Sequence, residues 1–440
     1  MRKPWESGRL CVSEKGRYLQ NGKKPFFWLG DTAWLLIEKL TEQEMQAYLR
    51  NRAEKNFNVV QAVLVHHSGM QDAAGNAALC GDDFQLPDTE HGFWDSVDTL
   101  VKLAEQEGLY VALLPVWGSM VKGGFLNMSN AEAYGAFLAT RYKSRPNIIW
   151  LIGGDVRGNE GYEVWNLLAT TIKSIASKQL MGFHPFGRTR SALWFHEQLW
   201  LDFNMFQSGH RRYDQASLGA WDDNNQMEGF VGEDSWKYVL RDYEMNPAKP
   251  TLDGEPSYEL IPQGLHDSTQ PYWQACDARR YAYWSVFAGA CGHTYGNNAV
   301  MQFYRREDKE ASYGALNYWH EAVHDTGSGQ MGHLYNLMCS VDFSTGHMAE
   351  EWLGQPQGEK YERISVFSGE GFAFFYTYTG QPFKVSLQPA DGAAVHASWF
   401  DPVTGTYSYI GQIQGGGVKE FIPPNRRMGQ NDWVLVLKAE

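Results

Sequence analysis

The stretch NIIWLIGGDVRG, residues 147–158, runs from an apolar segment into two glycines and an acid. We predict a strand over residues 147–154, whose terminal glycines would let the backbone approach a ligand closely. The stretch is one of eight short apolar runs that alternate with amphipathic segments over the first 340 or so residues. That alternation is the pattern of repeated β-α units around a parallel sheet.

The predicted strands are residues 26–30, 59–65, 110–117, 147–154, 180–185, 203–209, 250–255 and 292–296. Helical patterns lie at residues 41–56, 91–108, 130–146, 162–179 and 278–290, with the last barrel helices within 316–340. The first helix opens with Thr41 followed by Glu44, the spacing of a capping box. Eight strands with intervening helices predict a (β/α)₈ TIM barrel, which places an active site at the C-terminal ends of the strands.

The pattern of residues along the sequence changes near residue 345. From there on, short β-rich runs such as KVSLQP and DWVLVLKAE are separated by Gly, Pro and Asp. We therefore predict a catalytic barrel over residues 1–345 and a small antiparallel β-sandwich over residues 346–440. The acids of the second domain lie in turns such as FDPVTG, so we expect this domain to stabilise the barrel without a catalytic role.

The net charge of −13, from 38 Lys and Arg against 51 Asp and Glu, disfavours nucleic acid or an anionic membrane as a partner. Aromatic residues make up 14% of the chain, with 17 Trp and 23 Tyr. Flat apolar rings with a polar edge suit carbohydrate, although a Trp-rich core explains the same composition. The five cysteines are scattered and lack C-x-x-C spacing, so neither a disulfide framework nor a zinc site is indicated.

Two acids at predicted strand ends carry the chemistry of our main hypothesis. Asp155 follows strand four and Glu255 follows strand seven, about 100 positions later. A barrel of about 250 residues gives roughly 31 residues to each unit, so this separation independently matches three units. Two carboxyl groups converging on one cleft are what glycoside hydrolysis needs, one as a protonated acid and one as a nucleophile or base.

Ordinary roles compete with each of these interpretations. An Asp after Gly-Gly is often a turn residue or a helix N-cap, and Asp253 suits a loop or supporting role. The strand-end histidines lie on separate strands without H-E-x-x-H spacing, so hydrogen bonding is favoured over metal binding and we expect no metal or cofactor. Ser208 lacks a G-x-S-x-G context, and the glycine runs lack a Walker lysine.

We expect the sugar pocket to be lined by residues at or just beyond strand ends, together with two from the WFHEQLW segment. These candidates are Asp31, Trp34, Trp117, His184, Trp194, His196, Gln207, His210, Tyr258 and Tyr295. Aromatic side chains would cover ring faces, while amide and imidazole groups would hydrogen-bond hydroxyl groups.

The runs FFWLGDTAW, IIWLIGGDVRG, WFHEQLWLDFNMFQSGH, PTLDGEPSYE and SWFDPVTG together resemble the apiosidase-like glycoside hydrolases, glycoside hydrolase family 140. The resemblance spans about residues 5–438 and implies a (β/α)₈ domain followed by a β domain that is often labelled collagen-binding. It implies Asp155 of GGD as the acid/base and Glu255 of DGEP as the nucleophile of a retaining mechanism. The activity it implies is release of apiose from the pectin rhamnogalacturonan II.

Other hypotheses remain open from the sequence. The chain could hydrolyse another linkage, such as an arabinofuranoside or a glucoside, or it could be a carbohydrate-binding barrel without catalysis. Its first residues, MRKPWESGRL, lack the apolar run of a signal peptide. We therefore expect a cytoplasmic protein acting on oligosaccharides, or a secreted or periplasmic one if a signal segment has been removed. Oligomerisation is left open.

Overall fold

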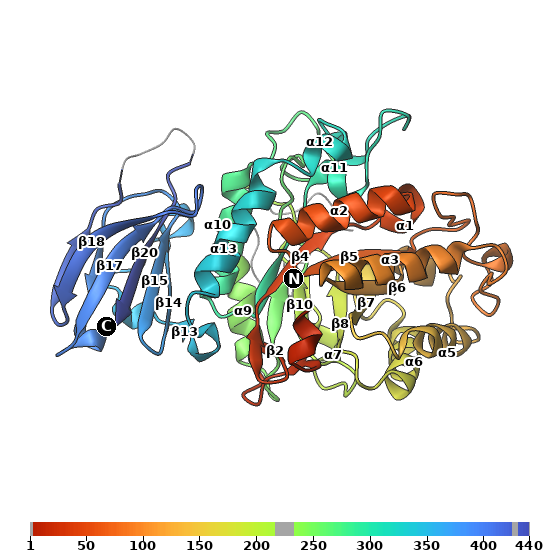
Figure 1. Ribbon diagram of the computed structural model, residues 1–440, viewed down its shortest axis with the longest axis horizontal. Helices are drawn as coiled ribbons and strands as arrows, with labels where there is room; N and C mark the ends of the chain where they lie inside the picture. The colour runs from red at the N-terminus through yellow and green to blue at the C-terminus, as the bar shows by residue number, and fades with distance from the viewer. Residues whose placement is uncertain (1–2, 216–232, 425–429, 440) are drawn as a thin grey trace.

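The computed structural model describes residues 3–215, 233–424 and 430–439. Its first part is a ring of eight parallel strands surrounded by helices, as predicted (Figure 1). The ring strands are β4 (Trp28–Thr32), β5 (Val59–Val65), β6 (Tyr110–Val116), β7 (Ile148–Val156), β8 (Met181–Pro185), β10 (Asn204–Gln207), β11 (Thr251–Asp253) and β12 (Gly292–Tyr295). Each coincides with a predicted strand to within a few residues.

The sheet runs in the order β8-β7-β6-β5-β4-β12-β11-β10-β9 and forms a nearly closed barrel. The short strand β9 (Thr189–Arg190) pairs antiparallel with β10 and was not predicted. Asp202, just before β10, donates its backbone N–H to Met181 O at 2.8 Å and draws the two ends of the sheet together. A three-stranded antiparallel sheet, β1 (Leu10–Val12), β2 (Leu19–Asn21) and β3 (Lys24–Phe26), precedes the barrel.

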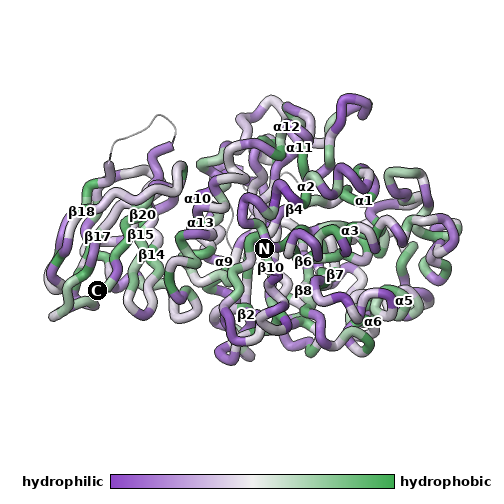
Figure 2. The backbone as a smooth tube through the Cα atoms, in the orientation of Figure 1, coloured by the Kyte–Doolittle hydropathy of each residue, from purple (hydrophilic) through white to green (hydrophobic). Residues whose placement is uncertain are grey.

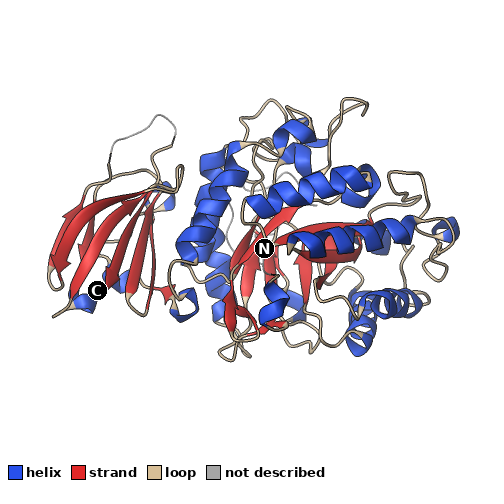
Figure 3. Ribbon diagram, viewed as in Figure 1, coloured by secondary structure: helices blue, strands red, loops and turns tan. Residues whose placement is uncertain are grey.

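Helices cover the barrel between its strands (Figure 3). The longer ones are α2 (Glu42–Glu54), α3 (Phe93–Glu107), α5 (Ala131–Tyr142), α6 (Tyr162–Ile175), α9 (Ser235–Tyr243), α10 (Ala275–Phe287) and α13 (Thr326–Met338). The shorter ones are α1 (Leu36–Lys39), α4 (Gly118–Lys122), α7 (Ala192–Phe195), α11 (Asn298–Met301) and α12 (Trp319–Ala322). The capping box predicted at Thr41 is present: its side chain accepts from Glu44 N, while the Glu44 carboxylate accepts from Thr41 N.

Single turns of 3₁₀ helix connect several elements, at Pro4–Ser7, Cys80–Asp82, Ser312–Gly314, Phe343–Thr345, Glu350–Trp352, Lys360–Glu362 and Gln388–Ala390. None of the helices in the described residues is long and apolar enough to cross a lipid bilayer. Much of the tryptophan content belongs to the core: Trp28, Trp94, Trp150, Trp165, Trp200, Trp273 and Trp284 are fully buried. A tryptophan-rich core therefore accounts for these side chains.

The C-terminal part is built of antiparallel strands. A six-stranded sheet has the order β13 (His347–Met348), β14 (Ile364–Gly369), β15 (Phe372–Thr377), β20 (Trp433–Ala439), β17 (Ala394–Phe400) and β18 (Tyr407–Gln414). A two-stranded sheet pairs β16 (Phe383–Ser386) with β19 (Val418–Phe421). Apolar side chains from both sheets form one core, so the predicted small β-sandwich is confirmed.

The second face of the six-stranded sheet packs on the barrel helices α10 and α13 (Figure 1). Tyr283 of α10 stacks on Tyr376 of β15 with ring centroids 4.6 Å apart. In Figure 2 the strands β14, β15 and β20 are largely hydrophobic, whereas the loop after α11 is hydrophilic. Both faces of β14, β15 and β20 are buried, one in the core of the C-terminal domain and one against the barrel, so these strands join the two domains.

Candidate active site

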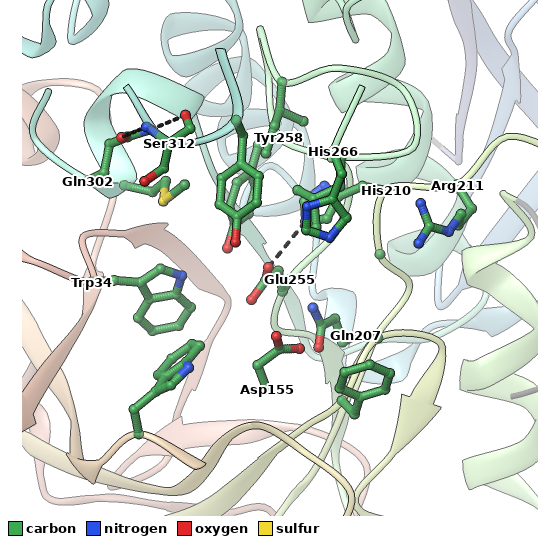
Figure 4. A pocket seen from close by; sticks show the side chains of 18 of the residues that line it. Trp34, Asp155, Gln207, His210, Arg211, Glu255, Tyr258, His266, Gln302 and Ser312 are labelled. Carbon is green, nitrogen blue, oxygen red and sulfur yellow. Dashed lines mark hydrogen bonds and ion pairs between the residues drawn. The ribbon is translucent and has the colours of Figure 1, made fainter. Parts of the chain in front are cut away.

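A cavity of about 320 Å³ opens at the C-terminal ends of the barrel strands. Asp155 and Glu255 both line it, and their carboxyl groups face the same space in Figure 4. The lining also contains Trp34, Trp117, Gln207, His210 and Tyr258, all five of which the sequence had placed in the pocket. The two candidate catalytic acids thus share one pocket with half of the predicted lining residues.

Asp155 reaches the pocket because the end of β7 is irregular. The pairing of β7 with β8 shifts register between Gly153 and Val156, a bulge of the kind that re-aims side chains beside active sites. Gly153, Gly154 and Asp155 have φ values of 94°, 116° and 50°, in the left-handed region. A Cβ atom on Gly154 would lie 2.7 Å from the Trp117 ring, so glycine is required there.

The surroundings of Asp155 favour its protonated form. Its side chain is accessible from the pocket, yet protein atoms pack closely around the carboxyl group. Burial, followed by the negative charge of Glu255, raises the pKa of Asp155 to about 7, although hydrogen bonds from Gln207 and from the Gly187 backbone oppose this. A carboxyl group with this pKa can hold a proton near neutral pH and donate it.

Glu255 follows β11 and is 8% exposed. Burial alone would raise its pKa, but contacts with the imidazoles of His184 and His210 outweigh burial and lower the pKa to about 2. His210 Nε2 lies 3.1 Å from Glu255 Oε1, and His184 Nε2 lies 3.3 Å from Oε2. Glu255 is therefore ionised at the pH where Asp155 is protonated.

His184 connects the two acids from behind the pocket. It is fully buried, and its Nδ1 accepts the backbone N–H of Asp155 at 3.4 Å. Because Nδ1 is the acceptor, the neutral ring carries its proton on Nε2, the atom that faces Glu255. The ring also packs edge-on against Trp34, at 5.2 Å between centroids. His184 thus does not line the cavity as predicted but supports both acids.

The remaining four predicted lining residues lie away from the cavity. Asp31 is fully buried and accepts hydrogen bonds from Tyr48 and Arg52, both at 2.5 Å. Tyr295 is buried and donates its hydroxyl to Glu259. A strand-end position brought both residues near the correct end of the barrel, but buried partners on neighbouring elements draw their side chains away from the cavity.

The WFHEQLW segment, expected to supply two lining residues, packs against the barrel instead. His196 is buried, with Nε2 2.9 Å from Pro247 O. Trp194 is partly buried against the hydrophobic core of the barrel. This segment therefore has a structural role in the described part of the chain.

The fold and this geometry can be compared with known proteins. The family model described as "Apiosidase-like, catalytic domain" matches residues 13–345, which is most of the chain. The chain belongs to the apiosidase-like glycoside hydrolases. A second model, described as "Putative collagen-binding domain of a collagenase", matches residues 349–438.

Two solved structures share the whole architecture of this apiosidase-like protein. One, described as a glycoside hydrolase, is 42% identical with a TM-score of 0.93, covering 100% of this chain and 98% of the other. The second, described as a glycoside hydrolase family 5 from Bacteroides vulgatus, is 40% identical with a TM-score of 0.93, covering 99% of this chain and 95% of the other. No curated protein matches the chain.

The pocket of this glycoside hydrolase also contains residues that the sequence-based prediction missed. They are Leu35, His66, Phe186, Gly187, Arg188, Gly209, Arg211, Ile261, Leu265, His266, Met301, Gln302, Ser312 and Tyr313. His66 directly follows β5, so its strand-end position was a usable signal. Its ring stacks on Trp117 with centroids 5.0 Å apart, and burial lowers its pKa to about 4. Leu265, His266, Ser312 and Tyr313 come from long loops without such a signal.

Four buried atoms of pocket-lining residues have no hydrogen-bond partner among the described residues: Gln207 Oε1, His210 Nδ1, Glu255 Oε2 and Tyr258 Oη. Buried polar atoms are nearly always paired, so hydroxyl groups of a bound sugar are suitable partners for them. In the same described part of the chain, no group of three His, Cys, Asp or Glu side chains is arranged to hold a metal ion. The arrangement thus offers aromatic rings, hydrogen-bonding groups and two carboxyl groups of opposite protonation state.

Proposed function

We propose that this protein is a retaining, exo-acting glycosidase in which Asp155 is the acid/base and Glu255 is the nucleophile. The observation that carries the proposal is that two carboxyl groups line one pocket, in surroundings that favour the protonated form of one and the ionised form of the other. Asp155 has a pKa raised to about 7 and Glu255 a pKa lowered to about 2. Glycosidases need such a pair, since one group must donate a proton while the other attacks as an anion.

In the first step Glu255 attacks the anomeric carbon while Asp155 gives its proton to the departing glycosidic oxygen. This forms a covalent glycosyl-enzyme and a free leaving group. Asp155, now ionised, then removes a proton from water, which attacks the anomeric carbon and releases Glu255 as a carboxylate. His184 and His210 hold the Glu255 carboxylate in place through contacts at 3.3 and 3.1 Å.

The proposed exo action rests on the size of the pocket. Its volume of about 320 Å³ lies near the lower end of the range of about 300–1,000 Å³ for small-molecule sites, which suits one terminal sugar. The proposed substrates are plant cell-wall oligosaccharides of the pectin type, with apiose as the first candidate for the released sugar. Membership of the apiosidase-like family supports this choice.

The decisive experiment joins a substrate screen to two substitutions. Wild-type protein would be tested against aryl glycosides, including arabinofuranosides and glucosides, and against pectin-derived oligosaccharides. With a hydrolysed substrate, proton NMR of the first-formed product should show the same anomeric configuration as the substrate. Inversion would contradict the nucleophile assignment, because an inverting enzyme uses the second carboxylate to activate water.

Glu255→Gln should abolish turnover of every substrate, because no covalent intermediate can form. Asp155→Asn should reduce kcat/KM by about 10²–10⁴-fold with a poor leaving group but far less with an activated aryl leaving group. Equal losses on both kinds of leaving group, with glycosyl transfer shown to limit the rate, would rule out Asp155 as the acid. Binding without turnover by wild-type protein would favour the non-catalytic alternative.

A further inference from the structure

A second hollow adjoins the catalytic pocket. It has a volume of about 440 Å³ and is lined by Leu265, His266, Ser268, Ser312, Tyr313 and Gly314. Four of these residues also line the catalytic pocket: Leu265, His266, Ser312 and Tyr313. The two spaces are therefore neighbours that share a wall.

Tyr313 is held in this wall by the barrel itself. Its φ of 53° is uncommon for a bulky residue and needs support from its surroundings. Asn298 Nδ2 donates to Tyr313 O at 2.9 Å, and Gln302 Nε2 donates to Ser312 O at 2.9 Å. Ser312 N in turn donates to Gln302 Oε1 at 2.8 Å. Because Asn298 and Gln302 belong to α11 and its C-terminal end, the loop is fixed to the end of strand β12.

Tyr313 lines both the catalytic pocket and the adjoining hollow and is partly exposed to solvent. Tyr313 is 37% exposed, and its ring lies 5.5 Å from the imidazole of His266. Burial, then the charges of Asp155 and Glu255, raises the pKa of Tyr313 to about 12. The tyrosine thus lies within electrostatic reach of both carboxyl groups and stays neutral near pH 7.

We propose that this hollow is the leaving-group subsite, in which Tyr313 stacks on the ring of the sugar that departs from Asp155. The inference rests on the proposed glycosidase function. A substrate whose terminal sugar fills the catalytic pocket must extend its next residue past the shared wall. There it meets an exposed aromatic ring flanked by the polar side chains of His266 and Ser268. An apolar face with polar groups beside it matches the two kinds of surface on a sugar ring.

The test compares two substrates that release the same sugar, the one identified in the substrate screen. One is its glycosyl fluoride, whose leaving group fills no subsite, and the other is an oligosaccharide ending in that sugar. Tyr313→Ala should lower kcat/KM for the oligosaccharide about five- to tenfold, mainly through KM. Loss of an aromatic stacking contact weakens binding by about this factor. The fluoride should change less than twofold. Tyr313→Phe keeps the ring and should recover most of the oligosaccharide rate that Tyr313→Ala loses.

Tyr409→Ala, at an exposed tyrosine of β18, is the matched control and should change neither rate. Equal losses on fluoride and oligosaccharide would overturn the proposal, because Tyr313 would then shape only the terminal-sugar pocket. An unchanged oligosaccharide rate would overturn it as well. Oligosaccharides with a neutral or a uronic acid leaving residue, run in parallel, show which ring the subsite accepts.

Failure of the glycosidase function would look different. In that case wild-type protein hydrolyses neither substrate, and Glu255→Gln changes nothing. Calorimetry on the Glu255→Gln variant still decides the subsite, with a pectin-derived oligosaccharide that binds wild-type protein and the single sugar found at its terminus as ligands. Adding Tyr313→Ala should weaken oligosaccharide binding about five- to tenfold and leave binding of the single sugar unchanged. Equal weakening of both ligands, or weakening of neither, would overturn the subsite.

Discussion

At the residue scale, the pocket sets two carboxyl groups to opposite protonation states. Asp155 has a pKa raised to about 7, so its proton persists up to that pH; Glu255 has a pKa lowered to about 2, so its charge persists down to that pH. We therefore expect kcat/KM to fall as pH rises through about 7 and as pH drops toward about 2. The two limbs belong to the coupled pair. Asp155→Asn should remove the basic limb; a basic limb that survives this substitution would assign it to another group.

The acidic limb depends on the imidazole contacts of Glu255. His210→Ala removes the Nε2 contact at 3.1 Å, so the pKa of Glu255 should rise and the acidic limb should move to higher pH. A hydrogen bond to a charged group is worth about 1.5–3 kcal/mol, which corresponds to about one to two pH units. The pH dependence of kcat/KM measures this shift. His347→Ala, at an exposed histidine of the C-terminal domain, should leave the limb in place.

The residue types at strand ends predicted only part of the active site. Asp155, Glu255, Gln207 and His210 could be placed because each lies at or just beyond the end of an apolar strand. Asp31 has the same sequence signature, but Arg52 of α2 pairs with it inside the protein. A buried partner 21 positions away does not alter the residue pattern around the acid. The sequence alone therefore could not separate a structural acid from a catalytic one.

At the element scale, the irregular end of β7 positions Asp155 in the active site. Gly154→Ala should destabilise the protein by about 1–3 kcal/mol, because a left-handed φ of 116° is strained for alanine and the new Cβ meets Trp117. It should also lower kcat/KM, since both Trp117 and Asp155 would move. Urea unfolding and steady-state kinetics measure the two effects.

Gly392→Ala provides the control for this element. Gly392 also has a positive φ, of 78°, but a Cβ there meets no atom within 4 Å. This variant should lose stability through backbone strain alone and keep full activity. If Gly154→Ala retained wild-type kcat/KM, the close packing of β7 against Trp117 would not be needed for the active site.

The eight ring strands were predictable because parallel strands buried on both faces form continuous apolar runs. The antiparallel strand β9 has two residues, too few for a periodic pattern to register. The pocket wall formed by Leu265, His266, Ser312 and Tyr313 comes from loops whose positions depend on side-chain amides such as that of Gln302. Such loops carry no hydrophobic period, and so the pocket's outer wall was outside the reach of sequence patterns.

At the scale of the whole molecule, buried polar contacts join the C-terminal domain to the barrel. Arg279 of α10 donates from Nε and Nη2 to the carboxylate of Asp432, at 2.8 and 2.7 Å, with both side chains fully buried. Tyr361 of the C-terminal domain donates to Glu233 of the barrel at 2.6 Å, and Arg280 also contacts that carboxylate. These contacts tie the two domains together beside the shared apolar core.

Asp432→Asn tests how far the two domains stabilise each other. The substitution leaves the Arg279 guanidinium buried without its counter-charge, and breaking a buried ion pair in this way costs about 3–5 kcal/mol of unfolding free energy. Urea denaturation followed by tryptophan fluorescence measures the loss. Glu107→Gln removes the partner of exposed Arg50, a pair that should contribute at most about 1 kcal/mol. Equal losses in the two variants would mean that water reaches the Arg279–Asp432 pair and that this pair contributes little to holding the C-terminal domain on the barrel.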